Sequence, residues 1–315
     1  MNNAPAVGIE LSVVLAAAHS RAGLEACLTS LKDQVSGGEI DVIVACNCCE
    51  GAGRSIEEAF PFVRLIEAPP GTTVPELRTL GIQAATGRIV ALLEDNSIVA
   101  PTWCRAIRRA HAAPQEIVGG AVERDGTHRA VDWAVYFYEY GKYMLPCVEG
   151  VSATLSGNNV SYKRTLLQEI QDEFRNGFFE AFLHERLRRQ GSTLYMAPDA
   201  VVYHTLRYRV GKVLVQTFHH GRHYAGRRVA AASRLTRLGY AAGSTLLPVI
   251  LPLRIAQLVL HRRRHLRELT VAMPYLVLFM TSWACGELMG YLCGCLLYTS
   301  PSPRDRTRSR MPSSA

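Results

Sequence analysis

Two acidic segments of the chain place carboxylates where they could do chemistry. Glu94, Asp95 and Asn96 follow directly on an apolar run, and Glu180 lies among phenylalanines in the segment NGFFEAFLHERLRRQG. Carboxylate and amide oxygens at the end of a buried strand suit a hard divalent cation that holds a diphosphate. A carboxylate in apolar surroundings has a raised pKa, which suits a general base. The sequence therefore predicts a cation site and a separate proton acceptor.

Each of these polar residues could instead have a purely structural role, and the sequence alone does not decide between the two. The acidic triplet could cap a helix that begins near Thr102, and Glu180 could interact with the macrodipole at a helix N-terminus. Gly157, Asn158 and Asn159 could line a cleft with side-chain amides or form a plain turn. His204 ends an apolar stretch, where it could be a satisfied core residue or contact a phosphate or a metal ion.

Missing motifs argue against several kinds of site. The chain has no Gly-x-Gly-x-x-Gly, Walker A or Gly-x-Ser-x-Gly sequence, so a dinucleotide cofactor, a P-loop ATPase and a methyltransferase are not supported. The cysteine cluster at positions 46–49 lacks the spacing of a metal site. We expect reduced thiols in a protein that faces the cytosol.

The elements that must position these residues alternate along the first hundred positions. Short apolar runs predict buried strands over 11–15, 41–45, 63–66 and 88–93. Segments with helical spacing lie between them, over 24–34, 55–60 and 75–87. This alternation is typical of an α/β fold with a doubly wound, mostly parallel sheet. Ligands bind beyond the carboxyl ends of such strands, so residues 46–50 and 94–96 are the first places to look.

Residues 101–235 have a more mixed pattern. It predicts helices over 103–112 and 178–190, and strands over 117–122, 194–196 and 201–203. An aromatic segment, VDWAVYFYEYGKY, separates these groups.

The C-terminal third is apolar and basic. Residues 269–294 are long enough to cross a bilayer, with Glu287 tolerated; a buried core helix is the alternative. Residues 226–268 form a basic juxtamembrane region, in which 246–260 lies in the membrane interface or makes a first span. We favour the interface, because a crossing would leave one basic cluster outside. The basic side chains suit the anionic cytoplasmic leaflet, and no nucleic-acid motif accompanies them.

The last residues, 295–315, change abruptly to serine, proline and arginine and look like a translated sequencing adapter, so we expect a non-native tail. The 315 residues carry a nominal net charge of +8. The tail holds four arginines and one aspartate, so the remainder carries about +5. A hydrophobic content of 48% excludes a disordered chain, and the length allows one large α/β domain or two ordinary ones.

Taken in order, the motifs resemble family-2 inverting glycosyltransferases of the GT-A fold, in a bacterial membrane-associated branch. The resemblance covers about residues 10–225 and rests on LSVVLAA, DVIVACN, ELRTLGIQAATGRIVALLEDNS, SGNNVSYKR and GFFEAFLHERLRRQG, with WACGELMGYLCG further on. It implies a GT-A domain over 1–225 that moves a sugar from a nucleotide-diphosphate sugar to a hydroxyl of a lipid-linked or glycan acceptor. It also implies work in cell-envelope polysaccharide or glycolipid synthesis, with the catalytic domain on the cytoplasmic side of the inner membrane.

The resemblance further implies roles for single residues. Glu180 would be the catalytic base, and Glu94, Asn96 and His204 would hold Mg²⁺ or Mn²⁺. The nucleotide sugar would contact a wider set: Ala17, Cys46, Asn47, Arg78, Glu94, Asp95, Asn158 and His204.

Three positions depart from the family pattern. Cys46 and Asn47 stand where the second strand usually ends in aspartate, the metal motif reads Glu-Asp-Asn instead of Asp-x-Asp, and the usual Glu-Asp pair is Glu180-Ala181. These departures keep a second hypothesis open, namely a catalytically inactive membrane scaffold with the same fold. The retained carboxylates and His204 favour the enzyme.

Overall fold

The computed structural model describes residues 8–35, 37–47, 53–124, 126, 129–175, 177–229 and 232–293. The segment predicted to be non-native, 295–315, lies outside them. The chain divides into two compact units, one of residues 1–128 and 139–207 and the other of residues 129–138 and 208–315. The domain boundaries expected from the sequence remain predictions.

The first unit is built on a nine-stranded sheet in the order β3-β2-β1-β4-β8-β6-β9-β5, with β7 paired to β9. The four strands at one end run parallel, as the alternating pattern predicts: β1 (Leu11–Ala17), β2 (Ile40–Cys46), β3 (Val63–Glu67) and β4 (Ile89–Glu94). The other half is mixed: β5 (Ser97–Val99), β6 (Ile117–Arg124), β7 (Gly150–Ser152), β8 (Val160–Lys163) and β9 (Leu194–His204).

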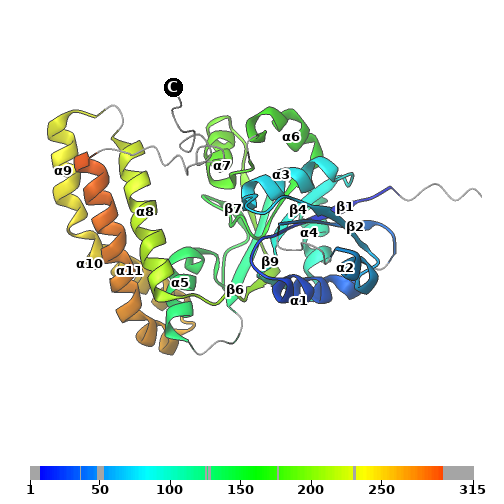
Figure 1. Cartoon of the computed structure of the whole chain (residues 1–315), viewed down its shortest axis with the longest axis horizontal. Helices are drawn as coiled ribbons and strands as arrows, with labels where there is room; N and C mark the ends of the chain where they lie inside the picture. The colour runs from blue at the N-terminus through cyan, green and yellow to red at the C-terminus, as the bar shows by residue number, and fades with distance from the viewer. Residues whose placement is uncertain are drawn as a thin grey trace, which may run out of the picture. The chain divides into compact units, whose positions relative to one another are not determined.

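Helices cover both faces of the parallel half of the sheet (Figure 1). The side chains of β1 point alternately toward the two helical layers. Leu11, Val13 and Leu15 face a large core shared with α1 (Arg21–Leu31), α2 (Gly53–Ala59) and α4 (Trp103–His111). Ala16 points to the opposite face, where it packs with Leu77 of α3 (Val74–Ala84). Because successive side chains of a strand alternate, a strand that is buried along its whole length, as β1 is, needs a layer on each side.

Two parts of the mixed half differ from the predicted elements. The short strands predicted over 194–196 and 201–203 are one strand, β9, whose pairing with β6 shifts register between Gly120 and Ala121. The aromatic segment forms α5 (Ala130–Glu139) and then a short 3-10 turn, η2 (Gly141–Tyr143). The remaining elements of this unit are η1 (Lys32–Gln34), α6 (Arg164–Glu169), η3 (Gln171–Phe174) and α7 (Glu180–Arg189).

The second unit is helical and contains most of α5 with α8 (Val210–Arg228), α9 (Arg234–Ser244), α10 (Leu247–Arg262) and α11 (Leu266–Cys293). α8 and α11 approach closely at glycines: a Cβ on Gly286 would lie 2.0 Å from the backbone oxygen of Phe218. Glu287 is buried here and accepts hydrogen bonds from Trp283 Nε1 at 2.6 Å and Tyr291 Oη at 2.7 Å. These bonds satisfy a carboxylate that would otherwise be costly in an apolar helix.

Within the described residues, α11 is the one helix long and apolar enough to cross a membrane by itself. α9 and α10 would meet the same test only as a pair, and they are bent by 60° at the break between them. Length and composition therefore allow one span, or two if the bent pair is a broken one.

Candidate active site

The site is organised around Arg78, whose side chain is almost fully buried in the first unit. Its Nη1 donates to Oε2 of Glu180 at 2.5 Å, and its Nη2 donates to Oε1 of Glu94 at 2.7 Å. The same Nη2 donates to the carbonyl oxygen of Gly157 at 2.9 Å. One guanidinium thus joins the two carboxylates that the sequence singles out, although they are 86 positions apart in the chain.

Local structure explains why Arg78 lies at this point. Thr73 and Glu76 form a capping box at the start of α3, which fixes the first turn and places Arg78 one turn inside the helix. Burial alone would lower the pKa of Arg78, but Glu180 and Glu94 outweigh it, so the pKa is raised above its ordinary value. Arg78 therefore stays charged, and it holds both carboxylates in one place.

These side chains line one cavity of about 210 Å³. Arg78, Glu94, Asn158 and Glu180 all contribute to its wall, so four of the predicted site residues meet there. Glu139 and Lys142 also line the cavity, and the sequence analysis missed both. They lie at the end of α5 and in the following turn, and the only signal was two charges inside an otherwise aromatic segment.

Glu139 is a carboxylate in an unusual position. Burial, and to a smaller extent the nearby charge of Glu94, raise its pKa to about 7. The cavity therefore has three carboxyl groups, from Glu94, Glu139 and Glu180, facing the cations of Arg78 and Lys142. A concave site that groups carboxylates and cations in this way, one carboxyl having a raised pKa, is typical of functional centres.

The surroundings of Glu180 differ from the apolar pocket predicted from its neighbours. Phe178 is fully buried, whereas Phe179 and Phe182 are each 50% exposed, and the carboxylate of Glu180 pairs with Arg78 instead. The prediction failed because Glu180 begins α7, where its side chain leaves the phenylalanine cluster. Beside it lies a buried pair, with Tyr162 Oη 2.7 Å from His184 Nε2. Burial lowers the pKa of His184 to about 4, so this imidazole is neutral.

Asp95 is buried, and its carboxylate bonds the loop that follows β1. Its Oδ2 accepts hydrogen bonds from the backbone N–H groups of His19 at 2.7 Å and Ser20 at 3.0 Å, and its Oδ1 lies 2.6 Å from His19 Nδ1. Ser20 is the N-cap of α1. Asp95 therefore ties the end of β4 to the start of α1.

The residues predicted to hold a metal ion are only partly brought together. Asn96 Nδ2 donates to Oε2 of Glu94 at 3.2 Å, so these two side chains are neighbours. His204 is fully buried in β9, with its ring 4.7 Å from that of Tyr140. Burial, then Arg124 and His19, lower the pKa of His204 to about 3. Within the described residues, no cluster of three or more His, Cys, Asp or Glu side chains could hold a metal ion. Glu94 and Asn96 both carry oxygen atoms of the kind that a hard cation prefers. Oε2 of Glu94 accepts from Asn96 Nδ2, and Oδ1 of Asn96 accepts from Ser97 Oγ at 3.2 Å, so a cation would have to replace these bonds.

A family model decides the identity of the fold. The model described as glycosyltransferase like family 2 matches residues 8–223, more than half of the chain. The chain belongs to this family. Among solved structures, the fold is similar to that of the mannosyltransferase PcManGT from Pyrobaculum calidifontis in complex with GDP-Man and Mn²⁺. That match has a TM-score of 0.52 and 15% identity, and it covers 95% of this chain and 83% of the other. No curated protein matches the chain. The predicted GT-A fold and family are thus confirmed.

In this glycosyltransferase domain, the ends of β1 and β2 meet as predicted. Ala17 pairs in register with Cys46, and the backbone N–H of Asn47 donates to the carbonyl of Ala17 at 3.1 Å. The amide of Asn47 donates to the carbonyl of Thr72 at 2.5 Å. Cys46 is disulfide-bonded, which corrects our expectation of a reduced thiol there. Cys48, Cys49 and Glu50 lie outside the described residues.

In the Gly157–Asn159 segment of the glycosyltransferase domain, Asn158 lines the cavity and the side chain of Asn159 lies in the core. Asn158 Oδ1 accepts from Ser156 Oγ at 2.6 Å, while its Nδ2 is buried with no partner among the described residues. The side chain of Asn159 points into the core, where it bonds the carbonyl oxygens of Ala121 and Ala200 and the indole of Trp103. Asn158 therefore lines the cavity and has an amide donor that is buried and unsatisfied, while Asn159 holds the loop.

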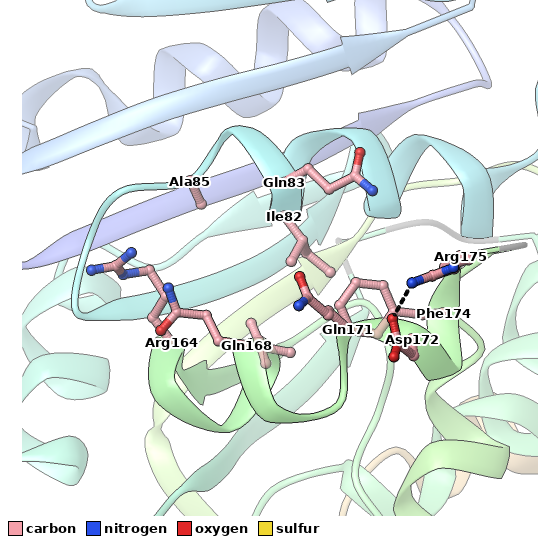
Figure 2. A pocket seen from close by; sticks show the side chains of 10 residues that line it. Ile82, Gln83, Ala85, Arg164, Gln168, Gln171, Asp172, Phe174 and Arg175 are labelled. Carbon is pink, nitrogen blue, oxygen red and sulfur yellow. Dashed lines mark hydrogen bonds and ion pairs between the residues drawn. The ribbon is translucent and has the colours of Figure 1, made fainter.

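A second hollow of the glycosyltransferase domain lies elsewhere (Figure 2). It has a volume of about 340 Å³ and is lined by the C-terminal half of α3 together with α6 and η3. Its charged pair, Asp172 and Arg175 at 2.6 Å, is exposed at the surface, and none of the predicted site residues lines it. Size therefore does not identify the active site here; the grouping of buried charges does.

Proposed function

We propose that the protein is an inverting glycosyltransferase that moves a sugar from a nucleotide-diphosphate sugar to a hydroxyl acceptor. The observation that carries this proposal is the shared cavity in which Arg78 joins Glu94 to Glu180. A carboxylate at the end of a central strand beside a second carboxylate supplies the two groups that the reaction needs, one on the donor side and one on the acceptor side.

In the reaction, Glu180 takes the proton of the acceptor hydroxyl while that oxygen attacks the anomeric carbon. The bond from the anomeric carbon to the diphosphate breaks, and the nucleoside diphosphate leaves with the electron pair. A single displacement of this kind inverts the anomeric centre. Arg78 holds the carboxylate of Glu180 in place at the cavity, and the unpartnered amide of Asn158 would offer a donor to a sugar or phosphate oxygen.

A divalent cation, Mg²⁺ or Mn²⁺, fits the acidic end of the cavity. Glu94 and Asn96 would hold it; His204, whose charged neighbours are Arg124 and His19, is the least supported of the predicted ligands. When bound, the cation would neutralise charge on the departing diphosphate. The solved neighbour carries Mn²⁺ with GDP-Man, which supports both the metal and a nucleotide-sugar donor.

The nucleotide would lie beyond the ends of β1, β2 and β4. Ala17, Cys46 and Asn47 meet at this edge, and Asp95 holds the adjoining loop through His19 and Ser20. Loops at the carboxyl ends of parallel strands are the usual ligand site of such sheets.

We further propose that the second unit attaches the enzyme to the inner membrane with the catalytic domain in the cytoplasm, where it serves cell-envelope glycan or glycolipid synthesis on a lipid-linked or glycan acceptor. Several large apolar side chains of α9, α10 and α11 are exposed in this unit: Leu235, Leu238, Val249, Leu253, Leu260, Val277, Leu278 and Leu292. An apolar surface of this extent supports contact with lipid.

The first prediction tests the base. Glu180→Gln should retain binding of the donor, seen as a thermal shift with UDP-, GDP- or dTDP-sugars, and lose sugar transfer by about 10²- to 10⁴-fold. Near-normal turnover would remove Glu180 from this role. If no nucleotide sugar or divalent cation shifts the melting temperature of the wild-type protein, the inactive-scaffold hypothesis is the better one. That hypothesis draws support from Arg78, which already neutralises both carboxylates.

A further inference from the structure

The second hollow, of about 340 Å³, is a groove between α3 and the segment formed by α6 and η3 (Figure 2), and we call it the α3–α6 groove. Its floor is apolar and buried, and it is made by Ile82, Leu167 and Phe174. A hydrogen bond from Thr79 Oγ1 to the carbonyl oxygen of Phe174, at 3.0 Å, ties the two walls together. The groove is therefore built into the packed part of the first unit.

The wall that α6 and η3 form is polar along one face. Four of its side chains line the groove at a spacing of four, three and four positions, which is close to that of one helical face: Arg164, Gln168, Gln171 and Arg175. Gln83 lies on the facing wall, in the C-terminal half of α3. A helix face that is turned toward a neighbouring helix is normally apolar. Carboxamide and guanidinium groups on this face are therefore not explained by packing.

Most of these polar groups have no partner within the protein. In the part of the chain that the structure describes, the amides of the three glutamines and the guanidinium of Arg164 form no hydrogen bond or ion pair. Arg175 differs, because it pairs with Asp172 at 2.6 Å. Among the described side chains, the groove thus presents three groups that can each donate and accept, together with one unpaired cation.

This set of groups suits a ligand that is neutral and rich in hydroxyl groups. A carboxamide can donate to one hydroxyl oxygen and accept from the next hydroxyl group. Of the described side chains that line the groove, only Arg164 offers an unpaired charge to an anion, and the carboxylate of Asp172 is already paired. A hydrocarbon chain would bury carboxamides without partners, which is costly. The lining therefore favours a carbohydrate.

The groove also reaches well away from the proposed base. The backbone N–H of Arg164 donates to the carbonyl oxygen of Arg88, just before β4 begins, and Glu94 ends that strand. About 20 Å of strand therefore separate this end of the groove from the candidate active site. Helix α3 runs past both places, with Arg78 bonded to Glu94 and Gln83 lying nearer the other end. A ligand at this end of the groove is not in position to react.

We propose that the α3–α6 groove is a second carbohydrate site, which holds a glycan chain apart from the sugar that reacts. Its occupant is a chain of neutral pyranose rings, with hydroxyl groups at the carboxamides and C–H groups over the apolar floor. Binding itself goes beyond the proposed transfer reaction, while its use there rests on the proposed function. A chain held at a second site has a raised effective concentration at the active site of the same molecule.

Replacement of glutamine by methionine removes the carboxamide and keeps the length of the side chain. The probes are maltohexaose, cellohexaose and mannohexaose, observed by saturation-transfer difference NMR on the full chain. No nucleotide sugar is added, so no transfer takes place, and the detergent has no sugar headgroup. We expect at least one hexasaccharide to be saturated in wild type, and its binding to be about tenfold weaker in the double variant Gln168→Met, Gln171→Met. Both glutamines are exposed, so the fold should be unaffected.

Gln190→Met is the matched control, because this glutamine is exposed and lies outside the groove. Binding of a neutral glycan should stay the same between about 0.05 and 0.5 M NaCl, since screening by salt acts on charges. The thermal shift given by nucleotide sugars is measured in the same variants, and it reports the proposed function separately.

The proposal is overturned if none of the three hexasaccharides is saturated, or if the double methionine variant binds as wild type does. Binding of tripolyphosphate that falls with salt and in Arg164→Met, without binding of a hexasaccharide, would make the groove an anion site instead. A wild-type protein that binds a hexasaccharide in the groove and no nucleotide sugar would support this site and count against the proposed function.

Discussion

Arg78 shows how much of this site depends on the geometry of one side chain. A guanidinium presents donors in a fixed planar fork, so it can bond two carboxylates and a carbonyl at the same time. The carboxylates of Glu94 and Glu180 both contact this one guanidinium, and without its positive charge between them they would repel one another. Arg78 thus acts on both proposed functional groups at once, as the counter-ion of each.

Arg78→Met should therefore destabilise the fold as well as the reaction. Removal of a buried cation from between two carboxylates leaves uncompensated charge, which we expect to cost about 2–4 kcal/mol of unfolding free energy. For a chain of this size the melting temperature would fall by about 5–10 °C. We expect Arg78→Met to lose sugar-transfer activity as well as stability.

The triple variant Arg78→Met, Glu94→Gln, Glu180→Gln is the control for this prediction. It removes the unpaired charges, so we expect most of the lost stability to return while transfer stays absent. Thermal and urea unfolding give the stability difference. If the triple variant is as unstable as Arg78→Met, the loss comes from packing of the side chain and not from charge.

At the scale of elements, the sequence predicted the parallel half of the fold well and the edges of the site less well. Strands β1 to β4 could be predicted because buried parallel strands are continuous apolar runs, and their carboxyl ends located Glu94 and Asn47. Helix α5 could not, since most of its residues are buried and no polar face reveals a helical period. Glu139 and Lys142 were missed for that reason. Arg78 was predicted as a nucleotide contact by family resemblance, and no sequence pattern indicates that α3 directs it toward two glutamates.

Gly157, in the loop before β8, lies against the side chain of Glu180. A Cβ at Gly157 would lie 2.2 Å from Oε1 of Glu180, so the glycine leaves the space that the carboxylate occupies. In Gly157→Ala the end of the flexible glutamate side chain must move. We expect a stability change within about 1 kcal/mol but a fall in turnover of about 10²-fold, because displacement of a reacting group by 1 Å has a cost of that order.

Steady-state kinetics with a fixed donor, together with thermal unfolding, measure both effects of Gly157→Ala. Gly8→Ala is the matched control, since an added Cβ at Gly8 meets nothing within 4 Å. Unaltered turnover in Gly157→Ala would mean that the carboxylate position does not matter for the reaction, and Glu180 would then be a structural residue.

At the scale of the whole molecule, the two units differ in what they leave exposed. The described part of the first unit exposes few large apolar side chains, with Phe179 and Phe182 among them, whereas α9, α10 and α11 expose many. Basic residues surround the start of α11: Arg262 ends α10, Arg263 and Arg264 lie between the two helices, and Arg267 is in the first turn of α11. Positive charge next to a span favours the cytoplasmic side, so a spanning α11 would put its C-terminal end on the other side.

Cys293 makes this orientation measurable, because it is an exposed thiol in the last turn of α11. Cys285 of the same helix is exposed too, so both arms carry Cys285→Ser. In intact cells, a membrane-impermeant maleimide should label this chain, and a further variant with Ser in place of Cys293 and Cys295 should lose that label. Cys27 and Cys104 are buried, and burial raises the pKa of both thiols, that of Cys104 to about 12, so they add little background. Labelling only after the cells are broken would place both ends of α11 on one side of the membrane. The helix would then be buried in the protein or lie in the interface, and the sugar-transferring unit would have to reach the membrane through α10 instead.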